Sequence, residues 1–181
     1  TQNKRTFKSS MDWQIKTMAG KSSATSAEFK PGDTVLSLIY KDSSDGLLAR
    51  VDLLEGEVEE FKLPGVPLGC WKRIIKEDGS QELNRQEQML VAEDFFFSLF
   101  EVSKEGKTNA GADELEALKH LLALLLERKR VLRAVGPRAK EGVQLYRHPK
   151  LEREFEIKVI TVYPELMQKI MDTMGDVFLQ S

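Results

Sequence analysis

The first half of the chain carries apolar and polar residues in short alternating runs separated by turn-forming residues. The run TVLSLIY is rich in β-branched and aromatic side chains, and it is followed by KDSSDG, which ends in the Asp-Gly pair favoured in hairpins. Such alternation is typical of half-buried strands. We therefore predict strands over residues 11–18, 34–40, 47–54 and 70–77. The acidic and then Pro/Gly-rich segment 55–69 between the last two is expected to be a surface loop.

The second half follows the helical period instead. Residues 85–101 place apolar side chains at helical spacing, and Asn84 with Glu87 three residues later predicts a capping box. After a polar loop, Asp113 is expected to cap a helix over residues 114–135, which ends at Gly136-Pro137. Its apolar positions, Leu132 included, run nearly all round, which predicts a central helix.

Two more alternating runs, 142–148 and 154–162, predict a second hairpin, and Pro164 suits the first turn of a last helix. Because strands are grouped and do not alternate with helices, the predicted class is α+β with antiparallel pairing. We expect a tail over 1–10, a small β unit over 11–80 and a helical α+β unit over 83–181 packed on it, or one continuous domain.

Composition narrows the class of protein. Hydrophobic residues make up 41% and charged residues 31%, which is typical of a globular chain, and the net charge of −2 gives no global sign of nucleic-acid binding. One cysteine excludes an internal disulfide, and the longest apolar run, 121–126, is far too short to cross a bilayer. The polar N-terminus has no secretory signal. We therefore expect a cytoplasmic protein with no membrane partner.

Residues 22–33, SSATSAEFKPGD, have the spacing of a zinc knuckle of the form C-x-x-[CT]-G-x-x-F-x-x-G-D. In this register Ser22 and Thr25 occupy the first pair of ligand positions, and Leu54 and Glu57 occupy the second pair. Structural zinc is bound by Cys and His, which all four positions lack. We therefore predict no metal and no cofactor, and expect the hairpin to be held by the packing of Trp13, Phe29, Val35, Ile39 and Leu54.

Other short motifs accompany this segment: Asp12-Trp13-Gln14-Ile15, Cys70-Trp71-Lys72, the helix end LERKRVL (126–132) and Tyr146-Arg147-His148. In combination they resemble a family of uncharacterised bacterial proteins with an N-terminal zinc-knuckle-like region. The resemblance covers roughly residues 11–181. It implies a shape but no established activity.

Candidate catalytic residues are few. A nucleophilic cysteine needs a base nearby, and Cys70 has no His close in sequence. We therefore interpret Cys70 as a small buried residue. His148 with Tyr146 is either an acid/base pair or a local hydrogen-bonding residue at a turn, and we favour the second; His120 carries no functional weight. Phosphate-loop, hydrolase and zinc-protease motifs are absent, so an enzyme is not favoured. An active site built from Asp and Glu side chains is the alternative that the sequence leaves open.

The segment 127–140, ERKRVLRAVGPRAK, is strongly basic. Its cations are Arg128, Lys129, Arg130, Arg133, Arg138 and Lys140. These side chains either bind phosphates or form a solvated surface at the end of the helix. In the second case they interact favourably with the helix dipole and with Glu152, Glu154 and Glu156.

The last helix carries a methionine stripe with Met167, Met171 and Met174, which is either core or an adaptable binding face. Taken together, these features predict a non-enzymatic protein–protein interaction or scaffold module that acts through its N-terminal β unit or C-terminal helix. The alternative is a nucleic-acid-associated accessory protein that uses residues 128–140.

Overall fold

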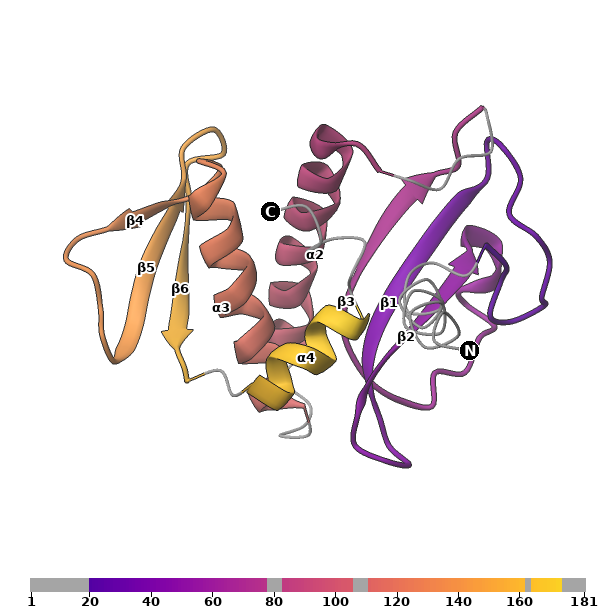
Figure 1. Cartoon of the computed structure of the whole chain (residues 1–181), viewed down its shortest axis with the longest axis horizontal. Coiled ribbons are helices and arrows are strands. Elements are labelled where there is room, and N and C mark those ends of the chain that lie inside the picture. The colour runs from indigo at the N-terminus through magenta and orange to yellow at the C-terminus, as the bar shows by residue number, and fades with distance from the viewer. Residues whose placement is uncertain (1–19, 78–82, 106–110, 162–163, 174–181) are drawn as a thin grey trace, which may run out of the picture.

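Two three-stranded antiparallel sheets lie on either side of a central pair of helices in the computed structural model (Figure 1). The structure describes residues 20–77, 83–105, 111–161 and 164–173. The strands are β1 (Thr34–Asp42), β2 (Leu48–Leu54), β3 (Gly65–Ile74), β4 (Arg133–Val135), β5 (Gly142–His148) and β6 (Arg153–Val159). The helices are α2 (Arg85–Glu105), α3 (Ala112–Arg128) and α4 (Pro164–Thr173), with a short 3-10 turn η1 (Glu55–Glu57). The predicted α+β class is confirmed.

In the first sheet, β1 lies between β2 and β3, and both neighbours are antiparallel to it. The expected hairpin of β1 and β2 forms, but the expected loop over 55–69 is wrong at its end, because β3 begins at Gly65. A register shift between Ile39 and Tyr40 puts Pro67 at a bulge in an edge strand, where the missing proline N–H is tolerated. The predicted strand 11–18 lies outside the described residues.

Helix α2 begins at the predicted capping box: Asn84 Oδ1 accepts from the Glu87 N–H at 2.8 Å, and Glu87 Oε2 accepts from the Asn84 N–H at 2.8 Å. The same helix then lies along the outer edge of β3. There Ser98 Oγ accepts from the Cys70 N–H at 2.9 Å, and Asp94 Oδ2 accepts from the Lys72 N–H at 3.1 Å. Two helix side chains one turn apart thus take the place of a fourth strand.

Helix α3 is shorter than predicted at its C-terminus. It begins after Gly111, which has a φ of 79°, rather than at a cap by Asp113, and it ends at Arg128. The Arg130 N–H donates to the Glu127 carbonyl at 2.9 Å and the Val131 N–H to the Leu126 carbonyl at 2.8 Å, which closes the helix as a Schellman motif. Leu132 therefore lies beyond the helix, and the unpredicted strand β4 follows it.

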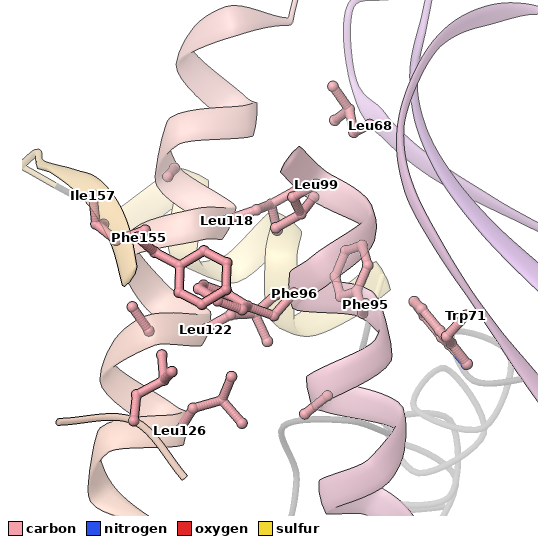
Figure 2. Packing of buried hydrophobic residues seen from close by; sticks show 14 of the residues in the cluster. Leu68, Trp71, Phe95, Phe96, Leu99, Leu118, Leu122, Leu126, Phe155 and Ile157 are labelled. Carbon is pink, nitrogen blue, oxygen red and sulfur yellow. The ribbon is translucent and has the colours of Figure 1, made fainter. Parts of the chain in front are cut away.

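The second sheet has the order β4-β5-β6, and its inner face packs on the two central helices. Phe155 of β6 lies 5.1 Å, ring centre to ring centre, from Phe96 of α2, and Trp71 of β3 lies 5.0 Å from Phe95 on the opposite side of α2 (Figure 2). One buried cluster therefore joins residues of both sheets with α2, α3 and Ile170 of α4. In the part of the chain that the structure describes, no helix is long and apolar enough to span a bilayer.

Candidate functional site

The hydroxyl and carboxyl groups of the proposed knuckle meet at one end of the first sheet. Ser22 Oγ donates to Glu57 Oε1 at 2.6 Å, Thr25 Oγ1 donates to Glu57 Oε2 at 2.7 Å, and the Leu54 N–H donates to Oε1 at 2.9 Å. We call this group, Ser22, Thr25, Glu57 and the Leu54 N–H, the carboxylate clasp. It joins two segments more than 30 residues apart in sequence through one side chain.

The turn that carries the two hydroxyls is organised around Ser22. Its Oγ accepts from the Ala24 N–H at 3.1 Å and from the Thr25 N–H at 3.3 Å, while the Ser26 N–H donates to the Ser22 carbonyl at 2.9 Å. The Thr25 Oγ1 likewise accepts from the Ala27 N–H at 3.4 Å. Because each hydroxyl oxygen is an acceptor in these bonds, its proton is free to be donated to the carboxylate. The turn therefore presents two donors that match the two oxygens of Glu57.

The Leu54 side chain takes no part in this polar group. It packs beside Phe29, Val35 and Ile75 in a small apolar cluster, whereas Ile39 belongs to the main core and Trp13 lies outside the described residues. Within the described ranges no three His, Cys, Asp or Glu side chains are grouped as a metal site. The absence of zinc stays a prediction, and metal analysis of the purified protein tests it.

Glu57 makes the clasp sensitive to acid. Hydrogen bonds from Ser22 and Thr25 hold the pKa of its carboxyl below the usual value. A depressed carboxyl pKa means that the stabilising contribution is complete above the unfolded-state pKa of about 4.3 and is lost as pH falls through the lower folded-state pKa. We expect Glu57→Ala to lower the free energy of unfolding by about 1–3 kcal/mol at pH 7, measured by urea denaturation.

Glu59→Ala is the matched control for that measurement, because Glu59 is an exposed carboxylate of the same segment. It should change stability by less than about 0.5 kcal/mol. The deficit of Glu57→Ala should also shrink when both proteins are unfolded at acid pH, since wild type loses its clasp there. Equal deficits at pH 7 and at acid pH would show that the carboxylate charge does not hold the clasp.

The core-facing side of the first sheet carries a second polar group. Asp52 Oδ1 accepts from Ser37 Oγ at 2.5 Å and from Arg50 Nε at 3.0 Å, and the Arg50 guanidinium lies 4.9 Å from the Trp71 ring centre. Ser37, Asp52 and Trp71 are all buried. The group is a structural network in which each partner already has a role in packing.

The candidate catalytic residues are engaged in structural contacts. Burial, with a smaller contribution from Asp94, raises the pKa of the Cys70 thiol, which disfavours the thiolate that a nucleophile needs. The buried His148 accepts the Leu151 N–H at its Nδ1, 3.2 Å away, and so presents Nε2 to Glu93 at 2.8 Å. Burial lowers the pKa of His120, whose Nδ1 accepts the Ile160 N–H.

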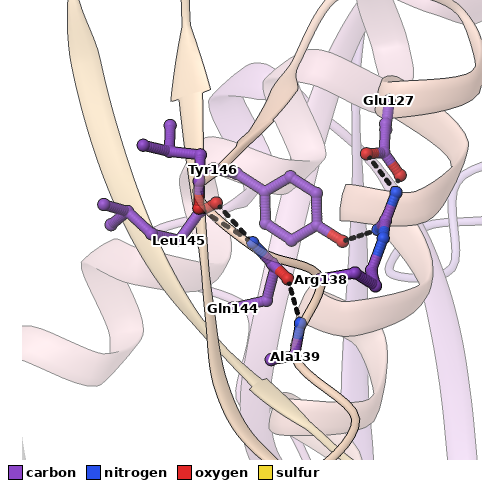
Figure 3. A network of polar contacts seen from close by, with 7 residues as sticks. Glu127, Arg138, Ala139, Gln144, Leu145 and Tyr146 are labelled. Carbon is purple, nitrogen blue, oxygen red and sulfur yellow. Dashed lines mark hydrogen bonds and ion pairs between the residues drawn. The ribbon is translucent and has the colours of Figure 1, made fainter.

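Tyr146, the expected partner of His148, belongs to a different network (Figure 3). The Arg138 guanidinium donates both to Glu127, at 2.8 and 3.1 Å, and to the Tyr146 hydroxyl at 3.4 Å. Nearby, Gln144 accepts the Ala139 N–H at 2.7 Å and donates to the Val135 carbonyl at 3.2 Å. Arg138 is thus a structural cation that ties the chain after β4 to the end of α3.

The other predicted interaction cations gather at the C-terminal end of α3 and on β4. We call this set the basic end, and its members are Arg128, Lys129, Arg130 and Arg133. All four are exposed, and none forms an ion pair with another described residue, Glu152, Glu154 and Glu156 included.

Sequence reasoning missed a fifth member of this surface. Arg147 of β5 lies directly opposite Arg133 in the β4–β5 register, and it is also exposed. Arg147 lies on the outward face of β5 with Val143 and Leu145, but only the register of the unpredicted β4 brings it beside Arg133.

The methionine stripe is only partly described. Ile170 of α4 is buried in the core, whereas Met167 is 37% exposed. The Met171 side chain and all of Met174 lie outside the described residues, so the interpretation of the stripe stays a prediction.

Comparison of the chain with protein-family models, with curated proteins and with solved structures finds no match.

Proposed function

We propose that the chain is a non-enzymatic binding module that contacts a protein partner through the basic end. The observation that carries this proposal is that two of its cations occupy positions where arginine lowers stability. Cationic side chains that form no ion pair with a described residue are available to a partner, and residues that violate local structural preferences cluster at functional sites. A cytoplasmic location goes with the proposal, because the only cysteine is a free thiol.

Arg130 is the first of these positions. Its φ is 64°, in the left-handed region, at the position of a Schellman motif that is usually glycine. A side chain with a Cβ costs about 1 kcal/mol in this conformation. The helix end would therefore close better with glycine, yet it carries an exposed guanidinium.

Arg133 is the second position. As a residue of the edge strand β4 it has one cross-strand neighbour, and this neighbour is Arg147. Like charges directly opposite each other in a sheet are destabilising by a few tenths of a kcal/mol up to about 1 kcal/mol. A bound anion would remove this repulsion, because it would contact both guanidinium groups.

The double variant Arg130→Gly/Arg133→Thr tests the proposal. We expect it to raise the free energy of unfolding by about 1 kcal/mol, since glycine suits the left-handed position and threonine suits an edge strand. We also expect it to lose most of the partners that wild type captures by cross-linking in extracts of the cells that express it, as quantified by mass spectrometry. If Arg130 and Arg133 have no part in binding, the double variant will gain stability and still capture the same partners as wild type.

A matched control is Lys30→Gln/Lys62→Gln, which removes two exposed cations from the first half of the chain. It should keep the capture profile of wild type. If the control and the double variant lose the same partners, capture depends on total charge, and the basic end is not the contact surface.

Nucleic acid is the second candidate partner, and the five exposed cations at 128, 129, 130, 133 and 147 favour it. Contacts with phosphates make the logarithm of the binding constant fall with the logarithm of salt concentration by about 0.9 for each contact in duplex DNA. A slope near −4 that weakens in the double variant would support this role. Absence of binding at low salt would exclude it.

A further inference from the structure

We propose that the partner surface extends from the basic end across the outer face of the second sheet, and that its ligand is an acidic protein segment with apolar side chains between its carboxylates. This inference rests on the proposed binding role and names the chemistry of the partner. The added residues are Val135, Val143, Leu145 and Arg147, which we call the outer sheet face.

The strand register places these residues on one face. Val135 of β4 lies opposite Leu145 of β5, and Arg133 lies opposite Arg147, so an apolar pair and a cationic pair form adjacent rows across the two strands. Successive side chains of a strand point to opposite faces, and the alternate residues Tyr146 and Ala134 point inward to the core cluster. The rows therefore face away from α2 and α3, on the side of the sheet where Figure 1 shows no described element. On β6 the same face continues with Glu154 opposite Arg147, Glu156 opposite Leu145 and Lys158 opposite Val143, so the ligand surface is the part of this face on β4 and β5.

The apolar row and Val143, which follows Leu145 on the same face of β5, are open to solvent. Val143 is 52% exposed and Val135 is 37% exposed, while Leu145 between them is partly exposed. Residues two apart in a strand are separated by about 7 Å. In an extended ligand, side chains two residues apart lie on the same face and are also about 7 Å apart. A ligand with a carboxylate and an apolar side chain at this spacing therefore contacts both rows at once.

Charge distribution favours an acidic ligand. Residues 127–158 contain ten Lys and Arg against five Asp and Glu, a formal excess of five positive charges in a chain whose net charge is −2. The remaining residues consequently sum to −7. The second sheet and its approach are thus a positive pole on an otherwise acidic protein, and a field of this kind speeds association with an anionic partner.

The distribution of aromatic rings favours protein over nucleic acid. Single-stranded nucleic acids bind by stacking bases on exposed aromatic side chains. The two aromatic residues of β5 and β6, Tyr146 and Phe155, are 1% and 4% exposed and point into the core. The outer sheet face offers aliphatic side chains in their place, which suit apolar side chains of a polypeptide.

The test uses the full chain and short fluorescent peptides in an anisotropy titration at low salt. One peptide repeats Glu-Ser-Leu-Ser, so that Glu and Leu follow each other on one face of the extended segment, and we call it the Glu/Leu peptide. The Glu/Ser peptide repeats Glu-Ser-Ser-Ser, and the Lys/Leu peptide repeats Lys-Ser-Leu-Ser. We expect the Glu/Leu peptide to bind at least about tenfold more tightly than the Glu/Ser peptide, and the Lys/Leu peptide not to bind. Val143→Ser should weaken the Glu/Leu peptide several-fold and leave the Glu/Ser peptide unchanged.

Leu47→Ser is the matched control, because Leu47 is 43% exposed and belongs to the first hairpin. It should leave all titrations unchanged. Equal binding of the Glu/Leu and Glu/Ser peptides, or no effect of Val143→Ser, would overturn the apolar part of the inference. Tighter binding of a duplex DNA than of any peptide, or no peptide binding at all, would overturn the acidic segment as ligand. The proposed function fails separately, when cross-linked capture does not depend on Arg130 and Arg133.

Discussion

Replacing Phe96 with Ala is expected to lower the free energy of unfolding by about 3–5 kcal/mol, a large part of the stability of an ordinary domain. Phe96 is fully buried on the side of α2 that faces the second sheet. Its ring lies 5.1 Å from Phe155 and 5.0 Å from Phe100, both in edge-to-face arrangements. Truncation removes the apolar burial and these ring contacts, and it leaves a cavity between helix and sheet.

Urea denaturation followed by circular dichroism measures this loss. Leu90→Ala, in the same helix but at a side chain that is 62% exposed, is the control and should change stability by less than about 0.5 kcal/mol. Because Phe96 lies between the helices and the second sheet, tryptophan fluorescence of the two variants in a Trp13→Phe background, which leaves Trp71 as the emitting tryptophan, should report the same midpoint as circular dichroism. A loss below about 1 kcal/mol would mean that the second sheet is not packed as described.

Replacing Asp52 with Ala is expected to destabilise the protein by about 3 kcal/mol or more. Asp52 is buried and accepts from both Ser37 and Arg50. Its removal leaves a guanidinium whose side chain is only 6% exposed without this counter-charge, and a buried hydroxyl without its acceptor. Removing one partner of a buried ion pair costs more than the pair contributes in net stability, because the groups that remain have already been desolvated.

Two further variants separate charge from hydrogen bonding at this position. Asp52→Asn keeps an oxygen that can accept from Ser37 but removes the negative charge, whereas Ser37→Ala keeps the ion pair. We expect the order of destabilisation to be Asp52→Ala, then Asp52→Asn, then Ser37→Ala, in chemical denaturation at pH 7. If Ser37→Ala proves as harmful as Asp52→Ala, the hydroxyl and not the ion pair dominates.

Features set by local sequence were predictable. The Asn84–Glu87 capping box and the start of the last helix at Pro164 depend on residues within one turn of each other, and both lie where expected. Spacing alone also brought Ser22, Thr25 and Glu57 together as candidates. Their mutual hydrogen bonding is not visible in the sequence, because knuckle spacing specifies metal ligands and not a carboxylate with two hydroxyl donors.

Features set by tertiary context were not predictable. The end of α3 has no glycine to mark it, since Arg130 takes the left-handed position, and the predicted helix therefore ran on to Val135. The strand β4 has three residues, too few for alternation to be visible. Missing β4 also hid the pairing of Arg133 with Arg147, and with it the outer sheet face.

The way α2 covers β3 has a consequence for unfolding. Asp94 and Ser98 occupy the outer N–H groups of Lys72 and Cys70, so the first sheet has a protected edge only while α2 is docked. Detachment of the helix uncovers a ten-residue strand whose free backbone groups can join a strand from another molecule. We therefore expect partial melting of α2 to expose an edge that favours intermolecular aggregation while the sheet itself is still folded.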